Sequence, residues 1–266
     1  MNNDFDELFR YDGCASCGYK ADTHQGKMDV SRVIDRLDAT LNSGDIEEAE
    51  RLLCHWQREA LYLQDKRAEL SIVNEQIGLY RRMGDKEKGL TAVERALSLI
   101  AALDMEETVS AATVLLNAAT TLKAFGKAEE AEPLYHKTLA VYEASLAKDD
   151  PLFGGFYNNY GLCLADLNRK EEAEKAFFSA LAIMEGKKKG LLEAGVTYVN
   201  LAHLYELWKD EQIHPCLMKA KALLLSSSIP RDGFYAFNVD KCIPSFLYYG
   251  LTEEAELLKR ERNSCK

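Results

Sequence analysis

Two cysteines near the start of the chain have a spacing that suits metal or redox chemistry. Cys14 and Cys17 are separated by two residues, and His24 follows them. Such residues can bind zinc, but a fourth ligand is not evident and a second Cys-x-x-Cys pair is missing. A redox role would need a βαβ context, which a helical chain lacks. We therefore expect no metal and no cofactor, and interpret the thiols as incidental to an N-terminal leader, residues 1–27.

Other catalytic patterns are missing from the sequence. It contains no Gly-rich phosphate loop followed by Lys and Ser or Thr, no HExxH and no GxSxG. The GKKKG stretch at residues 186–190 has a different spacing and lies between two predicted helices. The five histidines share no helical face, and the recurring glutamate pairs indicate solvated helix surfaces. We therefore expect a protein that is not an enzyme.

A recurring asparagine is the best functional signal. Asn117, Asn159 and Asn200 follow one another at steps of 42 and 41 residues within helical segments, and Asn158 adjoins the row. A side-chain amide both donates and accepts, so such a row can pair with successive peptide groups of an extended chain. Asparagine is also a weak helix former that needs compensation within a helix. The alternative is therefore that each amide bonds a neighbouring helix and orders the stack.

Basic residues lie one helical turn beyond this row. Arg81, Arg82 and Lys123 form the group, and His203 follows Asn200 by three residues. In a chain with a net charge of −10, grouped cations favour an acidic segment or a free carboxylate as the ligand. The same three cations fall in the last turns of predicted helices, where positive charge complements the helix dipole. Both interpretations stay open.

A repeat of about 42 residues supplies the elements that position these side chains. Candidate turn residues recur at steps of 40, 42, 42, 42 and 40: Gly44, Gly84, Gly126, Asn168, Asp210 and Gly250. Gly, Asn and Asp tolerate the left-handed backbone at a helix end. Five residues later stands a small residue, except at Pro215. Both flanks of each turn have helical periodicity. We predict helical hairpins at about residues 28–64, 66–103, 105–147, 150–186, 188–228 and 233–263, with Pro244 interrupting the last unit's first helix.

These features resemble the tetratricopeptide repeat (TPR) family. The matching residues are the Leu-Tyr pairs (Leu79-Tyr80 and Leu204-Tyr205), the turn glycine and the small residue five positions later. The family's usual period is about 34 residues, and the longer period here is similar to the repeats of kinesin light chains and their bacterial relatives. The resemblance implies an all-α superhelix of six hairpins whose first helices line a concave wall. It also implies that Asn117, Asn159 and Asn200 contact a peptide backbone.

Composition narrows the classes of partner. The negative net charge disfavours nucleic acid and anionic membranes, and no apolar run approaches the roughly 20 residues of a membrane span. Seven cysteines without regular spacing indicate reduced thiols and a cytoplasmic location. We expect a non-catalytic scaffold that binds a protein or peptide segment in its concave groove, and the first interpretation of the cations makes that segment acidic. The alternatives are a peptide-responsive sensor acting on a separate partner and, less favoured, a metal or redox module. Self-association is compatible with each of them.

Overall fold

The computed structural model describes residues 26–187 and 190–265, and within these ranges it contains twelve α-helices and no strand. The all-α prediction is therefore confirmed. Cys14, Cys17 and His24 lie outside the described residues, so the metal and redox alternatives for them stay predictions.

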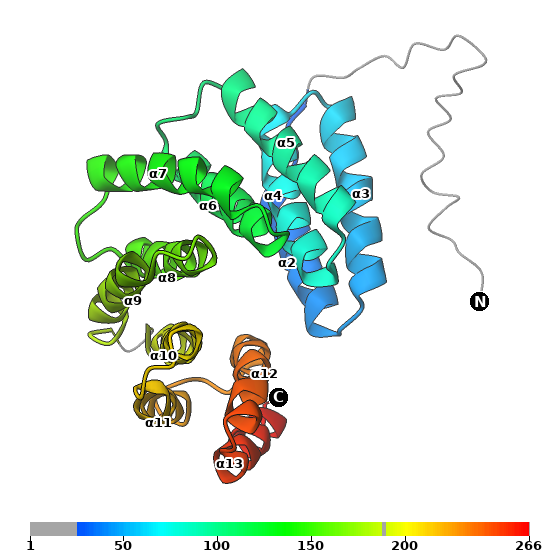
Figure 1. The fold of residues 1–266 in the computed structure, drawn as a ribbon. Coiled ribbons are helices and arrows are strands. Elements are labelled where there is room, and N and C mark those ends of the chain that lie inside the picture. Colours follow the sequence, from blue (N-terminus) through cyan, green and yellow to red (C-terminus); the bar gives the residue numbers. More distant parts are fainter. Residues whose placement is uncertain (1–25, 188–189, 266) are drawn as a thin grey trace.

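The helices form six antiparallel hairpins that stack into a curved superhelix (Figure 1). We call the earlier helix of each hairpin its first helix and the later one its second helix. The pairs are α2 (Val30–Asn42) with α3 (Ile46–Tyr62), α4 (Lys66–Met83) with α5 (Lys86–Ala102), α6 (Val109–Ala124) with α7 (Ala128–Ser145), α8 (Pro151–Asp166) with α9 (Lys170–Met184), α10 (Leu191–Leu207) with α11 (Ile213–Leu224), and α12 (Gly233–Tyr248) with α13 (Thr252–Asn263).

Short polar signals set the start and end of the early helices. The carboxylates of Asp45, Asp65 and Asp85 accept hydrogen bonds from the backbone N–H three residues later, at 2.9, 3.0 and 3.1 Å. Each therefore satisfies one of the free amides at a helix start. Gly44 and Gly84 precede two of these caps with φ of 81° and 72°, a conformation that costs glycine little. A hairpin turn of a few residues results.

The turn of the fifth hairpin differs from the sequence prediction. Its left-handed residue is Lys209, with φ of 53°, and not Asp210. Asp210 instead accepts a hydrogen bond from the Gln212 N–H at 3.1 Å. The turn therefore lies one residue earlier than predicted, and two residues, Asp210 and Glu211, separate it from Gln212, the N-cap of α11. Pro215 lies exposed in the first turn of α11, and Cys216 is the buried residue there.

The last hairpin also differs from expectation at its proline. Pro244 lies inside α12, which continues from Gly233 to Tyr248 without a break. The prediction that Pro244 interrupts this helix was therefore wrong. Loss of one backbone hydrogen bond is tolerated here because the helix is anchored by its buried residues, which include Tyr235 and Phe246.

Because Lys209 carries a side chain in a left-handed conformation, Lys209→Gly should stabilise the protein. The left-handed backbone costs a non-glycine residue roughly 1 kcal/mol, so we expect the free energy of unfolding in urea to rise by about 1 kcal/mol. Lys175→Gly, in the middle of α9, is the matched control and should lower it by about 1 kcal/mol. A loss of stability in Lys209→Gly would contradict the assigned turn.

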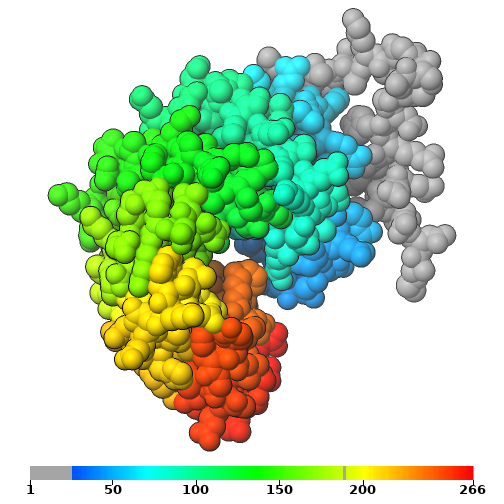
Figure 2. Space-filling view, in the orientation of Figure 1, coloured from blue at the N-terminus to red at the C-terminus, as the bar shows by residue number. Residues whose placement is uncertain are grey.

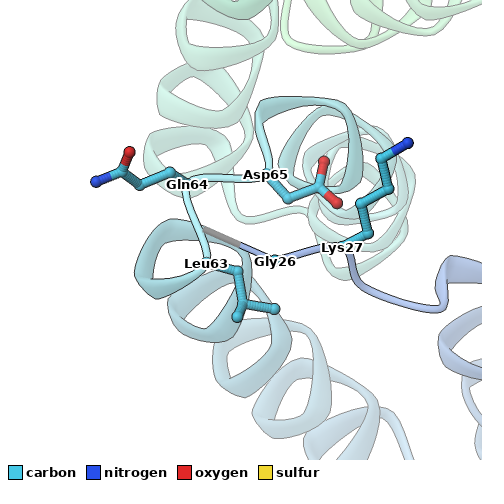
Figure 3. A pocket seen from close by; sticks show the side chains of 5 residues that line it. All are labelled: Gly26, Lys27, Leu63, Gln64 and Asp65. Carbon is cyan, nitrogen blue, oxygen red and sulfur yellow. The ribbon is translucent and has the colours of Figure 1, made fainter. Parts of the chain in front are cut away.

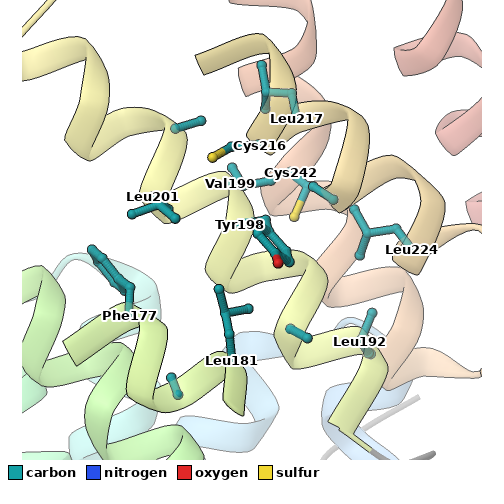
Figure 4. Packing of buried hydrophobic residues seen from close by; sticks show 14 of the residues in the cluster. Phe177, Leu181, Leu192, Tyr198, Val199, Leu201, Cys216, Leu217, Leu224 and Cys242 are labelled. Atoms are coloured by element: carbon teal, nitrogen blue, oxygen red, sulfur yellow. The ribbon is translucent and has the colours of Figure 1, made fainter. Parts of the chain in front are cut away.

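The core lies between the two helices of each hairpin and between successive hairpins. Figure 4 shows this packing where α9, α10, α11 and α12 meet. Glycine is required at two of the contacts: a Cβ on Gly89 would lie 2.6 Å from the Phe125 ring, and one on Gly161 would lie 2.8 Å from Phe177. The first contact holds α5 against the end of α6 in the next hairpin, and the second holds α8 against α9 in its own hairpin.

The first helices lie on the inner side of the curve. Each first helix contacts the first helix of the next hairpin, from α2–α4 through α10–α12. Among the successive second helices of the described chain, only α11 and α13 are in comparable contact. A stack whose first helices are packed more closely must curve toward them. Figure 2 shows the resulting hollow beside the green first helices, with α12 (orange) on its opposite side.

Candidate peptide-binding surface

One face of α8 is exposed toward the hollow, because its other faces are covered by neighbouring helices. A Cβ on Gly154 would lie 3.0 Å from Met184 of α9, so that face is covered. Phe153 packs against Tyr142 of α7, with ring centroids 5.7 Å apart. A Cβ on Gly155, by contrast, would have no neighbouring heavy atom within 4 Å. Open space therefore lies directly over the backbone of α8 at Gly155.

This face belongs to a surface that runs along all the first helices, and we call it the concave wall. One residue of each first helix stands nine positions before the left-handed turn residue of its hairpin. We call this set the ninth-position row: Asp35, Glu75, Asn117, Asn159, Asn200 and Lys241. The row therefore has acidic residues at its start, three amides in the middle and a cation at its end.

The three predicted asparagines use part of their hydrogen-bonding capacity within the protein. Asn117 Nδ2 donates to Asn74 Oδ1 at 2.9 Å, between α6 and α4. Asn200 Nδ2 donates to Asn158 Oδ1 at 3.0 Å, between α10 and α8. Asn159 Nδ2 donates at 2.9 Å to the carbonyl of Gly155 in its own helix.

These contacts fit the interpretation that two of the amides help to order the stack. Asn158 is held by a second donor as well, the Thr197 hydroxyl at 2.9 Å. The Oδ1 atoms of Asn117, Asn159 and Asn200 accept no hydrogen bond from any residue that the structure describes. The row thus keeps acceptors for the N–H groups of a ligand.

The four predicted selectivity residues do not form one cluster. Lys123 Nζ lies 3.4 Å from the Asp166 carboxylate of α8, so its charge is compensated. His203 Nε2 lies 2.8 Å from Ser245 Oγ, and its Nδ1 lies 3.2 Å from the hydroxyl of Tyr249. His203 therefore links α10 to the last hairpin.

The two arginines are placed differently from Lys123. Arg81 Nη1 donates to Thr121 Oγ1 at 3.1 Å and to the Asn117 carbonyl at 3.4 Å, which holds its guanidinium against α6. Arg82 reaches across the hollow, and its guanidinium carbon lies 5.1 Å from the ring centroid of Phe237 on α12. Arg81, Arg82 and Lys123 also occupy the last turns of α4 and α6, so the helix-dipole interpretation holds alongside any ligand contact.

Sequence reasoning missed the residues of α12 that face this wall. Lys241 stands 41 residues after Asn200, the same step as between Asn159 and Asn200, so the repeat register was a signal for it. Its ammonium lies 3.6 Å from the Phe237 ring centroid. Burial lowers the pKa of Lys241, and the nearby charges of Arg81 and Arg82 lower it further.

Two cavities lie near the N-terminal hairpins. One of about 110 Å³ opens between α2, α3 and α4, and leucines 37, 41, 53 and 79 line it together with Glu75, Gly78 and Arg82. The other, of about 430 Å³, lies where the chain before α2 passes the α3–α4 turn (Figure 3). There the Met28 N–H donates at 3.1 Å to Asp65, which also caps α4. This second cavity lies away from the ninth-position row.

The described part of the chain has neither a metal-binding cluster nor a helix suited to span a membrane. It contains no cluster of three or more His, Cys, Asp or Glu side chains arranged to hold a metal ion. None of its helices combines the length and the apolar character needed to cross a membrane.

Comparisons with known proteins agree with this architecture. A tetratricopeptide repeat family model matches residues 69–144 and 110–186, and no curated protein matches the chain. Among solved structures, BtubC (BKLC) from P. vanneervenii is similar, with a TM-score of 0.62 and 26% identity over 73% of this chain and 79% of that one.

Two further solved structures are similar in fold. A Podosopora anserina protein described as a kinesin light chain with nearly identical TPR-like repeats has a TM-score of 0.60 and 16% identity, over 74% of this chain and 97% of that one. A Rap protein solved in complex with Competence and Sporulation Factor has a TM-score of 0.53 and 13% identity, over 88% of this chain and 73% of that one. At such identities the likeness concerns the fold alone.

Proposed function

We propose that the chain is a tetratricopeptide repeat protein and a non-catalytic scaffold that holds an extended segment of a protein partner against the concave wall; the match of residues 69–186 to the tetratricopeptide repeat model and the fold support this. The ninth-position row would pair with the backbone of that segment through its free amide acceptors. This is preorganised recognition, since the hydrogen bonds of Asn117 and Asn200 to neighbouring helices fix their amides before a ligand arrives.

The observation that carries this proposal is the open space over Gly155. A glycine in the middle of a helix costs about 1 kcal/mol relative to alanine, and here no contact in the described chain requires it. Close approach of another backbone is one reason to keep a glycine at such a position. Asn159 lies one turn further along the same face, so a ligand passing over Gly155 would meet its amide.

An unbiased test is to select random displayed peptides on the immobilised protein and to measure the best one by calorimetry. Asn117→Ala combined with Asn159→Ala should weaken that peptide at least about tenfold, because amide contacts with a ligand backbone are lost. Far-UV circular dichroism should stay the same, and the free energy of unfolding in urea should fall only by about 1 kcal/mol, from loss of the bond between Asn117 and Asn74. Large loss of stability with unchanged binding would instead make the amides structural.

The peptide-responsive sensor is the second candidate, favoured by the contact between Arg82 and Phe237. That contact joins the second hairpin to the sixth, so a ligand in the hollow would bias how closely the two ends approach. Solution scattering with the selected peptide separates the candidates. A scaffold keeps its radius of gyration, and a sensor contracts. The cytoplasmic location and self-association along an exposed edge stay predictions.

A further inference from the structure

The smaller cavity, between α2, α3 and α4, has an apolar floor and a polar mouth. Leu37, Leu53 and Leu79 line it and are 2%, 0% and 5% exposed, so they form its floor. Glu75 and Gly78 line it as well and are only partly buried. A Cβ on Gly78 would meet no described heavy atom within 4 Å. The cavity is therefore open beside Glu75, a member of the ninth-position row.

The volume of the cavity suits one apolar side chain. It measures about 110 Å³, and leucine-lined cavities of roughly 150 Å³ in other proteins bind molecules of the size of benzene. A side chain such as that of leucine or methionine would therefore fit. Its transfer from water to the leucine surfaces would stabilise a complex.

Glu75 places a carboxylate at the mouth without a cation to pair with. It forms no ion pair within residues 26–187 and 190–265. Asn74 Nδ2 donates to its Oε1 at 3.2 Å, whereas its Oε2 accepts no hydrogen bond from a described residue. Burial raises the pKa of Glu75, the hydrogen bond from Asn74 lowers it, and the nearby Asp38 carboxylate raises it again. A cation at the mouth would stabilise this carboxylate.

Arg82 lines the cavity but does not supply that cation. Its guanidinium carbon lies 5.1 Å from the ring centroid of Phe237 on α12, so its head group is directed across the hollow. Arg82 also stands seven residues after Glu75, a distance of about 10 Å along the helix axis. A bound molecule can supply the charge that the mouth lacks.

We propose that this cavity binds the amino-terminal residue of the partner's segment, whose apolar side chain enters among the leucines and whose α-ammonium pairs with Glu75. The site rests on the proposed function and adds the chemical identity of one end of the ligand. An amino-terminal residue carries its charge at the Cα, outside its side chain, which matches a charged mouth above an apolar floor. A lysine side chain would instead bring its ammonium to the leucines, where an unpaired charge is costly to bury.

A chain of amide hydrogen bonds links this site to the ninth-position row. Asn117 Nδ2 donates to Asn74 Oδ1 at 2.9 Å, and Asn74 Nδ2 donates to Glu75 at 3.2 Å. The carboxylate and the first asparagine of the row are therefore held by the same side chain. Neighbouring first helices lie roughly 8–10 Å apart. At about 3.3 Å per extended residue, a segment that begins at Glu75 reaches Asn117 with about its fourth residue and then runs toward Asn159.

The test titrates three small probes into the isotopically labelled protein: L-leucinamide, N-acetyl-L-leucinamide and glycinamide. The nuclear magnetic resonance signal of the Gly78 amide reports binding. L-Leucinamide should bind at least about tenfold more tightly than the acetylated probe, which lacks the ammonium. It should also bind at least about tenfold more tightly than glycinamide, which lacks the apolar side chain. Glu75→Gln should reduce the preference for the free ammonium to near unity.

Glu87→Gln is the matched control for Glu75→Gln. Glu87 is exposed in the first turn of α5, a second helix, so this variant loses the same charge outside the concave wall and should keep the preference. Gly78→Leu tests the cavity separately. Leucine is a better helix former than glycine, so this variant should fold as stably as wild type. Its side chain should occupy the mouth and weaken L-leucinamide at least about tenfold.

The results that would overturn this site differ from those that would overturn the scaffold. Equal binding of the free and acetylated probes, a preference that survives in Glu75→Gln, or no binding of L-leucinamide would overturn the amino-terminal site. The scaffold would stand, because the displayed-peptide selection and the double Asn117 and Asn159 variant test it with longer ligands. Failure to enrich any displayed peptide would overturn the proposed function, and with it the assignment of the cavity to a partner's terminus.

Discussion

The Gly155→Leu variant is expected to fold at least as stably as wild type and to lose between about tenfold and about a hundredfold of its affinity for a groove-bound peptide. Leucine is a better helix former than glycine by about 0.8 kcal/mol. At Gly155 it meets no described atom within 4 Å of its Cβ. The added side chain would occupy the space assigned to the ligand backbone, and such an overlap costs roughly 1–3 kcal/mol. Urea unfolding and calorimetry measure the two effects.

Lys175→Leu provides the control for Gly155→Leu. Lys175 lies exposed on α9, a second helix, away from the concave wall. This variant adds the same side chain to the protein and should leave peptide affinity unchanged. Equal losses in both variants would indicate a nonspecific effect of surface leucine, and unchanged binding in Gly155→Leu would remove the ligand from α8.

The Arg95→Ala variant is expected to cause the largest loss of stability among single changes considered for this fold. Arg95 of α5 binds Glu69 of α4 through two hydrogen bonds, of 2.7 and 2.8 Å. The Glu69 side chain is only 3% exposed, whereas that of Arg95 is 41% exposed. Removing the arginine leaves a buried carboxylate without its partner, which costs about 3 kcal/mol. Urea unfolding followed by circular dichroism measures the difference.

Two further variants separate this burial effect from the loss of a surface charge. Arg51→Ala removes an exposed arginine that pairs with Glu48 at 2.8 Å, and such pairs contribute roughly 0.5 kcal/mol. The double variant Glu69→Met with Arg95→Met should recover much of the loss, because no buried charge then remains. If Arg95→Ala costs no more than Arg51→Ala, the buried pair does not hold α4 and α5 together.

Most of the fold could be predicted because its signals are local. The turn glycines and the helical periodicity on each side depend on a few neighbouring residues. The fifth turn was misplaced because Lys209 is not a residue type that favours a left-handed backbone. Its conformation is imposed by the packing of α10 and α11, which no local pattern records. Pro244 was misjudged for a similar reason, since burial of α12 outweighs the local preference of proline.

The candidate site was less predictable because it depends on contacts between distant hairpins. The step between repeats located Asn117, Asn159 and Asn200, but the partner of each amide depends on the offset between neighbouring helices. That offset joins Asn200 to Asn158 but leaves Asn159 bonded to its own helix. The meeting of Arg82 with Phe237 depends on the curvature summed over the whole stack. This summed curvature cannot be predicted from the periodicity of the sequence.

Photo-crosslinking tests the central claim, that the ligand lies on the concave wall, most directly. A photoreactive phenylalanine derivative is introduced in place of Leu152, which is 37% exposed on α8 three residues before Gly155, in one variant and of Lys175 in another, and each is irradiated with the selected peptide. The claim predicts an adduct with the peptide from position 152 and none from position 175. An adduct from position 175 alone would place the ligand on the outer surface and contradict the claim.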